Sequence, residues 1–347
     1  LDGLTTGTAN NALGSAAASS LTTGNYNSAV GNEALESATT GNHNNAFGYQ
    51  ALHVTTTGHS NTALGGHSMN KNTTGAHNTA VGYWSLGDGT QTGADNVSIG
   101  SHNLFNNTTG AGNVSVGRTA LYSNTTGNYN VAIGFEALKD NVTHSNNVAV
   151  GYHAAKDNLS AGLVAVGYRA LMSGNSSGGS NTAIGNNTLM NATSAQYLVA
   201  VGNDAMQNAT SSHWSVAVGR RCLYRLTSGS NNTAVGQGCA QHVTTGQYNT
   251  AMGGDCLQQT TTGNYNTAYG RVALSSNTTA SHNVAMGYQA ATSTTTGGSN
   301  VAIGSHALND NTTSNNQTAV GYNALQNATG GSNTAVGKNA GENITSG

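Results

Sequence analysis

Proline is absent from the 347 residues of this chain, and only 6% of the residues are charged, against about 25% in typical domains. Proline has no backbone N–H, so its absence is typical of a chain whose N–H groups are nearly all needed as hydrogen-bond donors. The net charge is -2. Without a basic surplus the chain has little to attract a phosphate backbone, so we expect no nucleic-acid partner.

Cysteine and long apolar runs are scarce as well. The 3 cysteines cannot all pair within the chain, which excludes a disulfide framework. No apolar run approaches the roughly 18 residues of a membrane span, and residues 1–5 do not resemble a signal peptide. No phosphate loop or nucleophile–base signature is present, so we expect neither a cofactor nor an enzyme.

What the chain does contain is a phrase that recurs along its whole length. The phrase reads N-T-A-V-G or a close variant, and three copies run from Asn78 to Gly82, from Asn130 to Gly134 and from Asn249 to Gly253. Its glycine recurs at 20 positions, and 15 of the 19 spacings between them are 17 residues. A strict period indicates a repeat protein.

Each repeat predicts a short strand just before its glycine, from which positions are counted below. Position -3 is Val or Thr in 17 of 20 copies, position -2 is always Ala or Ser, and position -1 is always a larger apolar residue or Tyr. This alternation is typical of a strand. A second extended segment is expected after the glycine, followed by a polar turn. The positions that are apolar in nearly every repeat do not follow helical spacing.

Stacking such coils in parallel, roughly 4.8 Å apart, covers each side chain with its counterpart in the next coil. We therefore predict an all-β fold, a parallel β-solenoid of about 20 coils of 17 residues, forming one repeat domain over residues 1–347. Neither end has an atypical capping repeat, so both ends are expected to be open.

Two residue types that recur at fixed positions of the repeat, glycine and asparagine, are expected to be structural. The glycine either turns the coil with a positive φ or allows another backbone to approach closely, and the sequence does not separate these two interpretations. Asparagine occupies position -4 in 16 of 20 copies and is expected to form a hydrogen-bonded ladder. Three of the four exceptions, Leu163, Leu198 and Ser215, predict a weakened ladder between them.

The phrase N-[TV]-A-[VI]-G-x-x-A-L resembles the head repeats of trimeric autotransporter adhesins. It is even more similar to the T-T-G-x-x-N-T-A-V-G repeats of phage tail-fibre-like proteins. The resemblance implies a left-handed, homotrimeric β-roll that attaches to a surface, located outside the cell, on the cell surface or on a virion. The 17-residue unit is longer than that of the adhesin heads, and their membrane anchor is absent from this sequence.

The residues themselves also suggest how a trimer would form. If Val and Leu point into the coil, the small Ala and Gly face can be the seam between sister chains. The alternative is a single-chain solenoid in which Ala fills a narrow interior.

Aromatic residues fall into two columns that are candidates for stacking on sugar rings, although shielding of the backbone is the plainer interpretation. Position +1 holds Tyr49, Tyr83, Phe135, Tyr152, Tyr168, Tyr288 and Tyr322, and position -5 holds Tyr26, Tyr129, Tyr197, Trp214, Tyr248 and Tyr265 with His43, His77 and His282. The segment from Tyr197 to Arg225 adds arginines. The receptor-contact candidates are Tyr197, Trp214, Arg220, Arg221, Arg225, Tyr248 and Tyr265.

Two further groups are expected to be structural. Cys222, Cys239 and Cys256 share position +3 on successive coils and are expected to be buried small residues, with no metal. Asp140 and Asp157 stack on neighbouring coils and could form a glycosidase pair, but a solvated edge shared with their neighbouring lysines is favoured.

Together these features predict a structural fibre or adhesin that holds a surface by many weak contacts, with a surface glycan as a candidate receptor. The alternative is a self-assembling extracellular filament built as a head-to-tail homopolymer. Ice binding by the Thr-rich turns is less favoured because residues 158–160 and 194–195 interrupt the Thr array.

Overall fold

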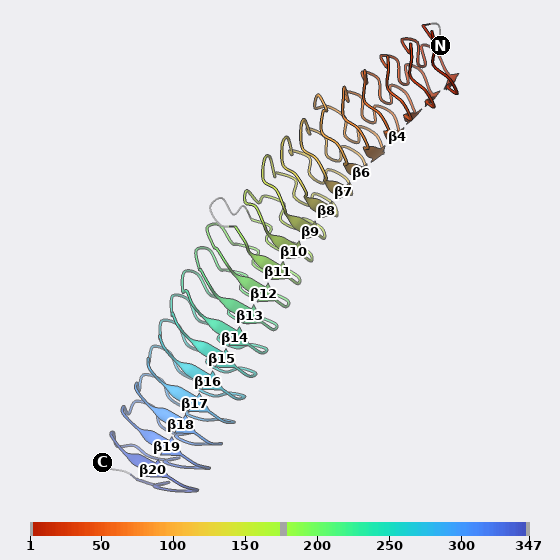
Figure 1. Ribbon diagram of the computed structural model, residues 1–347. Coiled ribbons are helices and arrows are strands. Elements are labelled where there is room, and N and C mark those ends of the chain that lie inside the picture. The colour runs from red at the N-terminus through yellow and green to blue at the C-terminus, as the bar shows by residue number, and fades with distance from the viewer. Residues whose placement is uncertain (1–2, 174–178, 345–347) are drawn as a thin grey trace. The chain divides into compact units, whose positions relative to one another are not determined.

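The computed structural model describes residues 3–173 and 179–344. It divides into two compact units, residues 1–174 and 175–347. Within each unit the chain winds in coils, and each coil carries one three-residue strand that pairs in parallel with the strand of the next coil (Figure 1). The described residues contain no helix. The predicted all-β parallel solenoid is therefore confirmed.

The strands of the first unit are β1 (Asn11–Leu13), β2 (Ser28–Val30), β3 (Asn45–Phe47), β4 (Thr62–Leu64), β5 (Thr79–Val81), β6 (Val97–Ile99), β7 (Val114–Val116), β8 (Val131–Ile133), β9 (Val148–Val150) and β10 (Val164–Val166). Those of the second unit are β11 (Thr182–Ile184), β12 (Val199–Val201), β13 (Val216–Val218), β14 (Thr233–Val235), β15 (Thr250–Met252), β16 (Thr267–Tyr269), β17 (Val284–Met286), β18 (Val301–Ile303), β19 (Thr318–Val320) and β20 (Thr334–Val336).

The register of these strands follows the repeat. Val81 of β5 lies opposite Leu64 of β4 on one side and Ile99 of β6 on the other. Equivalent residues of successive repeats are thus direct neighbours, as the period predicts.

The two faces of each strand are the reverse of the first expectation. The middle residue of every strand except β1 is buried, and Ala80, Ala132 and Ala217 have no exposed surface. Ile99 and Ile133, at position -1, are 40% and 39% exposed. The prediction that the valine face points into the coil and the alanine face outward is wrong. Leucines after the glycine, such as the fully buried Leu138, already fill the interior, so the facing strand has room only for a methyl group.

The expected second extended segment is also not a strand. Glu136 and Leu138, two and four residues after Gly134, have φ angles of 55° and 49°. The N–H of Glu136 donates to the Arg118 carbonyl of the preceding coil at 3.2 Å, and that of Leu138 donates to the Ala154 carbonyl of the following coil at 3.1 Å. Neighbouring coils are therefore hydrogen-bonded on this side without a strand.

Both interpretations of the repeat glycine apply. Gly82 has a φ of 130°, which residues with side chains rarely adopt. A Cβ atom on it would also lie 2.6 Å from the carbonyl oxygen of Gly100 in the next coil. The backbones of successive coils therefore approach each other closely at this corner.

The asparagines at position -4 form the expected ladder. Asn249 is almost fully buried, its backbone N–H and its Nδ2 both donate to Oδ1 of Asn232, at 3.0 and 3.1 Å, and Nδ2 also donates to the Gly263 carbonyl at 2.9 Å. Asn266 makes the same pair of bonds to Oδ1 of Asn249. Asn78 and Asn130 occupy the equivalent places in the first unit.

The ladder is weakened where the sequence departs from asparagine. The Leu163 side chain has no donor or acceptor, so Leu163 joins the ladder through its backbone N–H, which donates to Oδ1 of Asn147 at 3.2 Å. Ser215 substitutes in part, because its Oγ accepts the backbone N–H of Asn232 at 3.1 Å.

Candidate functional site

The rings at position -5 form parallel stacks on the surface of the second unit. Tyr197 and Trp214 lie 6.1 Å apart with planes inclined by 2°, and Tyr248 and Tyr265 lie 4.9 Å apart with planes inclined by 1°. His282 extends the second stack at 5.1 Å from Tyr265. These tyrosines and the tryptophan are between 47% and 60% exposed, so each stack offers flat faces and edges to solvent.

The three candidate arginines do not join this ring column. Arg220 and Arg221 line a polar hollow of about 190 Å³ together with Asp255, whereas Arg225 does not line it. Arg221 lies over the Tyr224 ring at 5.7 Å and 3.8 Å from a carboxylate oxygen of Asp204. Among the described residues no ring contact or ion pair links these arginines to Trp214. The patch expected from Tyr197 to Arg225 is therefore two separate features.

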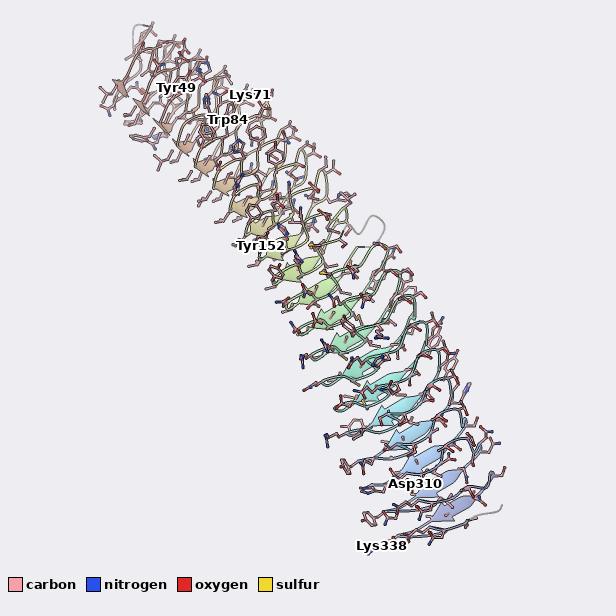
Figure 2. All side chains as sticks on the ribbon, turned by 180° about the vertical axis from the view of Figure 1, so that it is seen from behind. Tyr49, Lys71, Trp84, Tyr152, Asp310 and Lys338 are labelled. Atoms are coloured by element: carbon pink, nitrogen blue, oxygen red, sulfur yellow. The ribbon has the colours of Figure 1, made fainter. Side chains whose placement is uncertain are left out.

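A ring cluster in the first unit was only partly foreseen. Position +1 supplies Tyr49 and Tyr83, but Trp84, Phe105 and Tyr122 were missed (Tyr49 and Trp84 are labelled in Figure 2). Ring contacts run without a break through Tyr49, His67, Tyr83, Trp84, His102, Phe105 and Tyr122, at centroid distances from 4.4 to 6.3 Å. The missed rings stand at positions +2 and +5, which share the face that follows the glycine.

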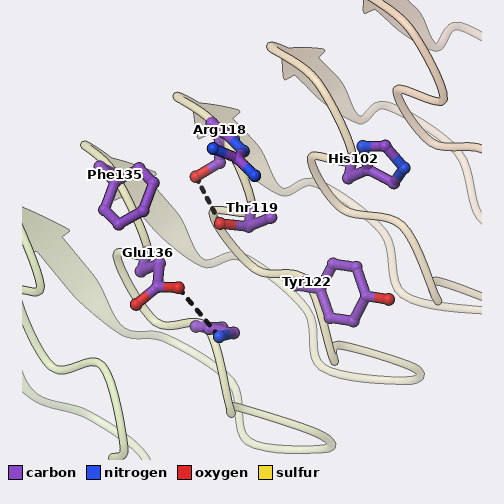
Figure 3. Close-up of a pocket in the computed structure, with 7 residues that line it drawn as sticks. His102, Arg118, Thr119, Tyr122, Phe135 and Glu136 are labelled. Carbon is purple, nitrogen blue, oxygen red and sulfur yellow. Dashed lines mark hydrogen bonds and ion pairs between the residues drawn. The ribbon is translucent and has the colours of Figure 1, made fainter.

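A second run of rings begins one coil further on. Phe135 stacks on Tyr152 at 5.4 Å, and Tyr152 stacks on Tyr168 at the same distance. A hollow of about 420 Å³ lies at the junction of the two ring runs, where Tyr122 ends the first and Phe135 begins the second. We call it the Thr119 pocket (Figure 3).

The Thr119 pocket exists because one short side chain stands between long ones. Position +2 forms its floor, with Thr119 between His102 and Glu136 of the neighbouring coils. Its two sides come from Arg118 and Phe135 at position +1 and from Tyr122 and Lys139 at position +5. The polar hollow of the second unit forms in the same way, with Gly238 on the floor between Arg221 and Asp255. We call that one the Gly238 pocket.

Electrostatics in the Thr119 pocket centre on Glu136. Burial alone would raise the pKa of its carboxyl, but hydrogen bonds from Lys139 and Lys156 outweigh burial and lower the pKa. Their Nζ atoms lie 2.9 and 3.0 Å from the carboxylate oxygens. Nε2 of His153 is 3.1 Å from the same carboxylate without making a hydrogen bond, and burial lowers the pKa of its ring. Glu136 is therefore ionised and already paired at neutral pH.

Asp140 and Asp157 do lie side by side on neighbouring coils. Burial, followed by the charge of Asp157, raises the pKa of Asp140. The lysines that were expected to alternate with these aspartates both bind Glu136 instead. Neither aspartate lines the Thr119 or the Gly238 pocket.

The three cysteines are free and fully buried. Cys239 and Cys256 are in contact, with 2.7 Å between their sulfur atoms. Among the described residues one group of metal-ligand type occurs elsewhere, formed by Glu33, Glu36 and His53. Its half-buried side chains already have partners, since Gln50 donates to Glu33 at 2.6 Å and His53 lies 3.1 Å from Glu36.

A scan of this chain against protein-family models finds no match, and a search of curated proteins finds no significant relative. Over the described residues, no helix has the length and apolar character needed to cross a membrane.

Proposed function

We propose that this chain is a structural attachment protein, a fibre or adhesin segment located outside the cell or on a virion, which holds a glycan-bearing surface through repeated contacts. The observation that carries the proposal is the set of exposed, parallel ring pairs at position -5, Tyr197 with Trp214 and Tyr248 with Tyr265. Flat rings that are already held in place contact the apolar face of a sugar at little cost in side-chain entropy.

The coil architecture supports this function because it repeats a weak site at short, fixed intervals. Ring pairs on coils roughly 4.8 Å apart can engage neighbouring sugars of one chain at the same time. Linked weak contacts multiply into a strong attachment when the geometry lets them bind together. Each coil is stabilised by the coils on either side of it, so the same weak site can be repeated along the stack.

We further propose that the working form is a homotrimer, associated through the outward face of the strands. All strand residues are uncharged, and position -1 presents half-exposed apolar side chains such as Ile133, Val218 and Met286 along each unit. Parallel sheets are usually covered on both faces, and an extended apolar face is typical of an interaction surface. A seam of alanine is excluded, because the strand alanines are buried inside the coil.

The proposal is tested by binding of the whole chain to a glycan array, followed by titration of any glycan retained. Trp214→Ala and Tyr248→Ala should each weaken binding by about 0.5–1.5 kcal/mol, or roughly two- to tenfold. Tyr129→Ala is the matched control, because this ring is exposed in the same column but has no stacked neighbour among the described residues. Absence of glycan binding, with micrographs showing indefinite threads, would instead favour the head-to-tail filament.

A further inference from the structure

The Thr119 pocket combines a hollow with neighbouring aromatic rings. It lies beside two ring runs, and its volume of about 420 Å³ is within the range of small-molecule sites. The Gly238 pocket has the same architecture, but its lining contains no aromatic ring. Of these two pockets, the Thr119 pocket is therefore the one that has aromatic rings in its lining.

One charge in the Thr119 pocket is left over after its ion pairs are counted. Lys139 and Lys156 both bind Glu136, and these three charges are mutually engaged. Arg118 is exposed and has no acidic partner within ion-pair distance among the described residues. Its guanidinium carbon lies 6.0 Å from the centre of the Phe135 ring, at the rim of the pocket.

We propose that the Thr119 pocket binds one acidic sugar residue, with the Arg118 guanidinium holding its carboxylate or sulfate and the Phe135 and Tyr122 rings flanking the sugar ring. This inference rests on the proposed attachment function and names its ligand class at one site. A guanidinium offers paired N–H donors in the geometry that a carboxylate or sulfate accepts.

The two rings are held in position before any ligand arrives. Phe135 is stacked on Tyr152 at 5.4 Å, and Tyr122 is stacked on Phe105 at 5.2 Å with planes inclined by 4°. Because these rings need not be ordered on binding, little affinity is lost to side-chain entropy. Glu136 and Lys139 complete the floor and side with fixed donors and acceptors for sugar hydroxyl groups.

The test uses titration calorimetry of the whole chain with three matched probes: methyl glucuronide, a glucose sulfate ester and methyl glucoside. We expect the acidic probes to bind at least tenfold more tightly than methyl glucoside. A preference between the two acidic probes identifies which anion Arg118 accepts.

Two variants locate that binding. Arg118→Gln should remove the preference for the acidic probes, and Thr119→Gln should abolish binding of all three by filling the floor, since Gln already stands at the equivalent positions 50 and 289. Arg271→Gln is the control, because Arg271 is an exposed arginine at the same position of a coil that lines neither pocket.

Equal binding of acidic and neutral probes, or equal losses in Arg118→Gln and Arg271→Gln, would overturn the inference. If array binding persists but does not change in Arg118→Gln or Thr119→Gln, the inference fails while the attachment function stands. If the chain binds no glycan on the array, the attachment function itself fails.

Discussion

Gly253 and Gly254 are adjacent in the sequence but differ in backbone conformation and in the space that surrounds them. Gly253 has a φ of 138°, and a Cβ atom on it would lie 2.6 Å from the carbonyl group of Gly270. Gly254 has no positive φ, and a Cβ atom there would meet nothing closer than Cγ of Arg271 at 3.9 Å. The first glycine is required by the backbone of the next coil, and the second is not.

Gly253→Ala should therefore destabilise the second unit by at least about 3 kcal/mol, because backbone strain adds to a clash that the stacked coils cannot relieve. Gly254→Ala should change the free energy of unfolding by no more than about 0.5 kcal/mol. Urea unfolding followed by circular dichroism measures both. Similar effects of the two substitutions would show that the coils are not in contact at this corner.

At this scale the sequence identified which residues recur but not how their backbones turn. The asparagine ladder could be predicted, because asparagines at one position of every repeat lie next to each other in successive coils and can form hydrogen bonds to each other. The positive φ angles of Glu136 and Leu138 could not, because neither residue type favours that conformation locally. Hydrogen bonds to the coils on either side stabilise it, and those are long-range contacts.

Among the elements of the coil, the column of buried cysteines is expected to make the stability of the second unit depend on pH. The contact with Cys222 is the main cause that raises the pKa of Cys239, and the contact with Cys239 is the main cause that raises the pKa of Cys256, with burial adding to both. The folded state therefore retains protons that the unfolded chain releases above the ordinary thiol value of about 9.

Stability of the second unit should be unaffected by these thiols below pH 9 and should fall as the pH rises above it, by roughly 1 kcal/mol per thiol for each pH unit. The loss is measured by unfolding at several pH values. Replacing all three cysteines by alanine, the residue that most coils have at this position, should remove it. Rapid labelling of the native thiols by a thiol reagent at pH 8 would contradict their burial.

The strand itself shows where a periodic pattern is insufficient. Alternation predicted a strand before each glycine, and every described repeat has one. It did not decide which face is buried, because valine and alanine are both apolar. The volume left beside leucines such as Leu138 decided it, and that volume depends on how wide the coil is.

For the molecule as a whole, trimerisation through the outward strand face predicts a mass in solution near three times 34.8 kDa. Ile133→Glu should shift sedimentation toward the single chain, because three carboxylates would be brought into one apolar seam. Val142→Glu is the control, since Val142 is 41% exposed but lies outside the strands. A native chain that sediments as a monomer, or equal dissociation by both substitutions, would contradict the proposed seam.

The candidate site was less predictable than the fold for a physical reason. The Thr119 pocket depends on the lengths of side chains in three successive coils, with Thr119 short between His102 and Glu136. Each of these residues is unremarkable in its own repeat. The ring stack of Tyr248 and Tyr265 was foreseeable, because both rings stand at one position of consecutive repeats.

The most direct test of the coil stack is the distance between equivalent side chains of adjacent repeats. In a chain whose three cysteines are replaced by alanine, Tyr248→Cys and Tyr265→Cys would carry spin labels where the native rings lie 4.9 Å apart. The coil stack predicts strong dipolar broadening for this pair and weaker broadening when the second label is moved one coil further, by His282→Cys. Narrow spectra from both pairs would contradict it.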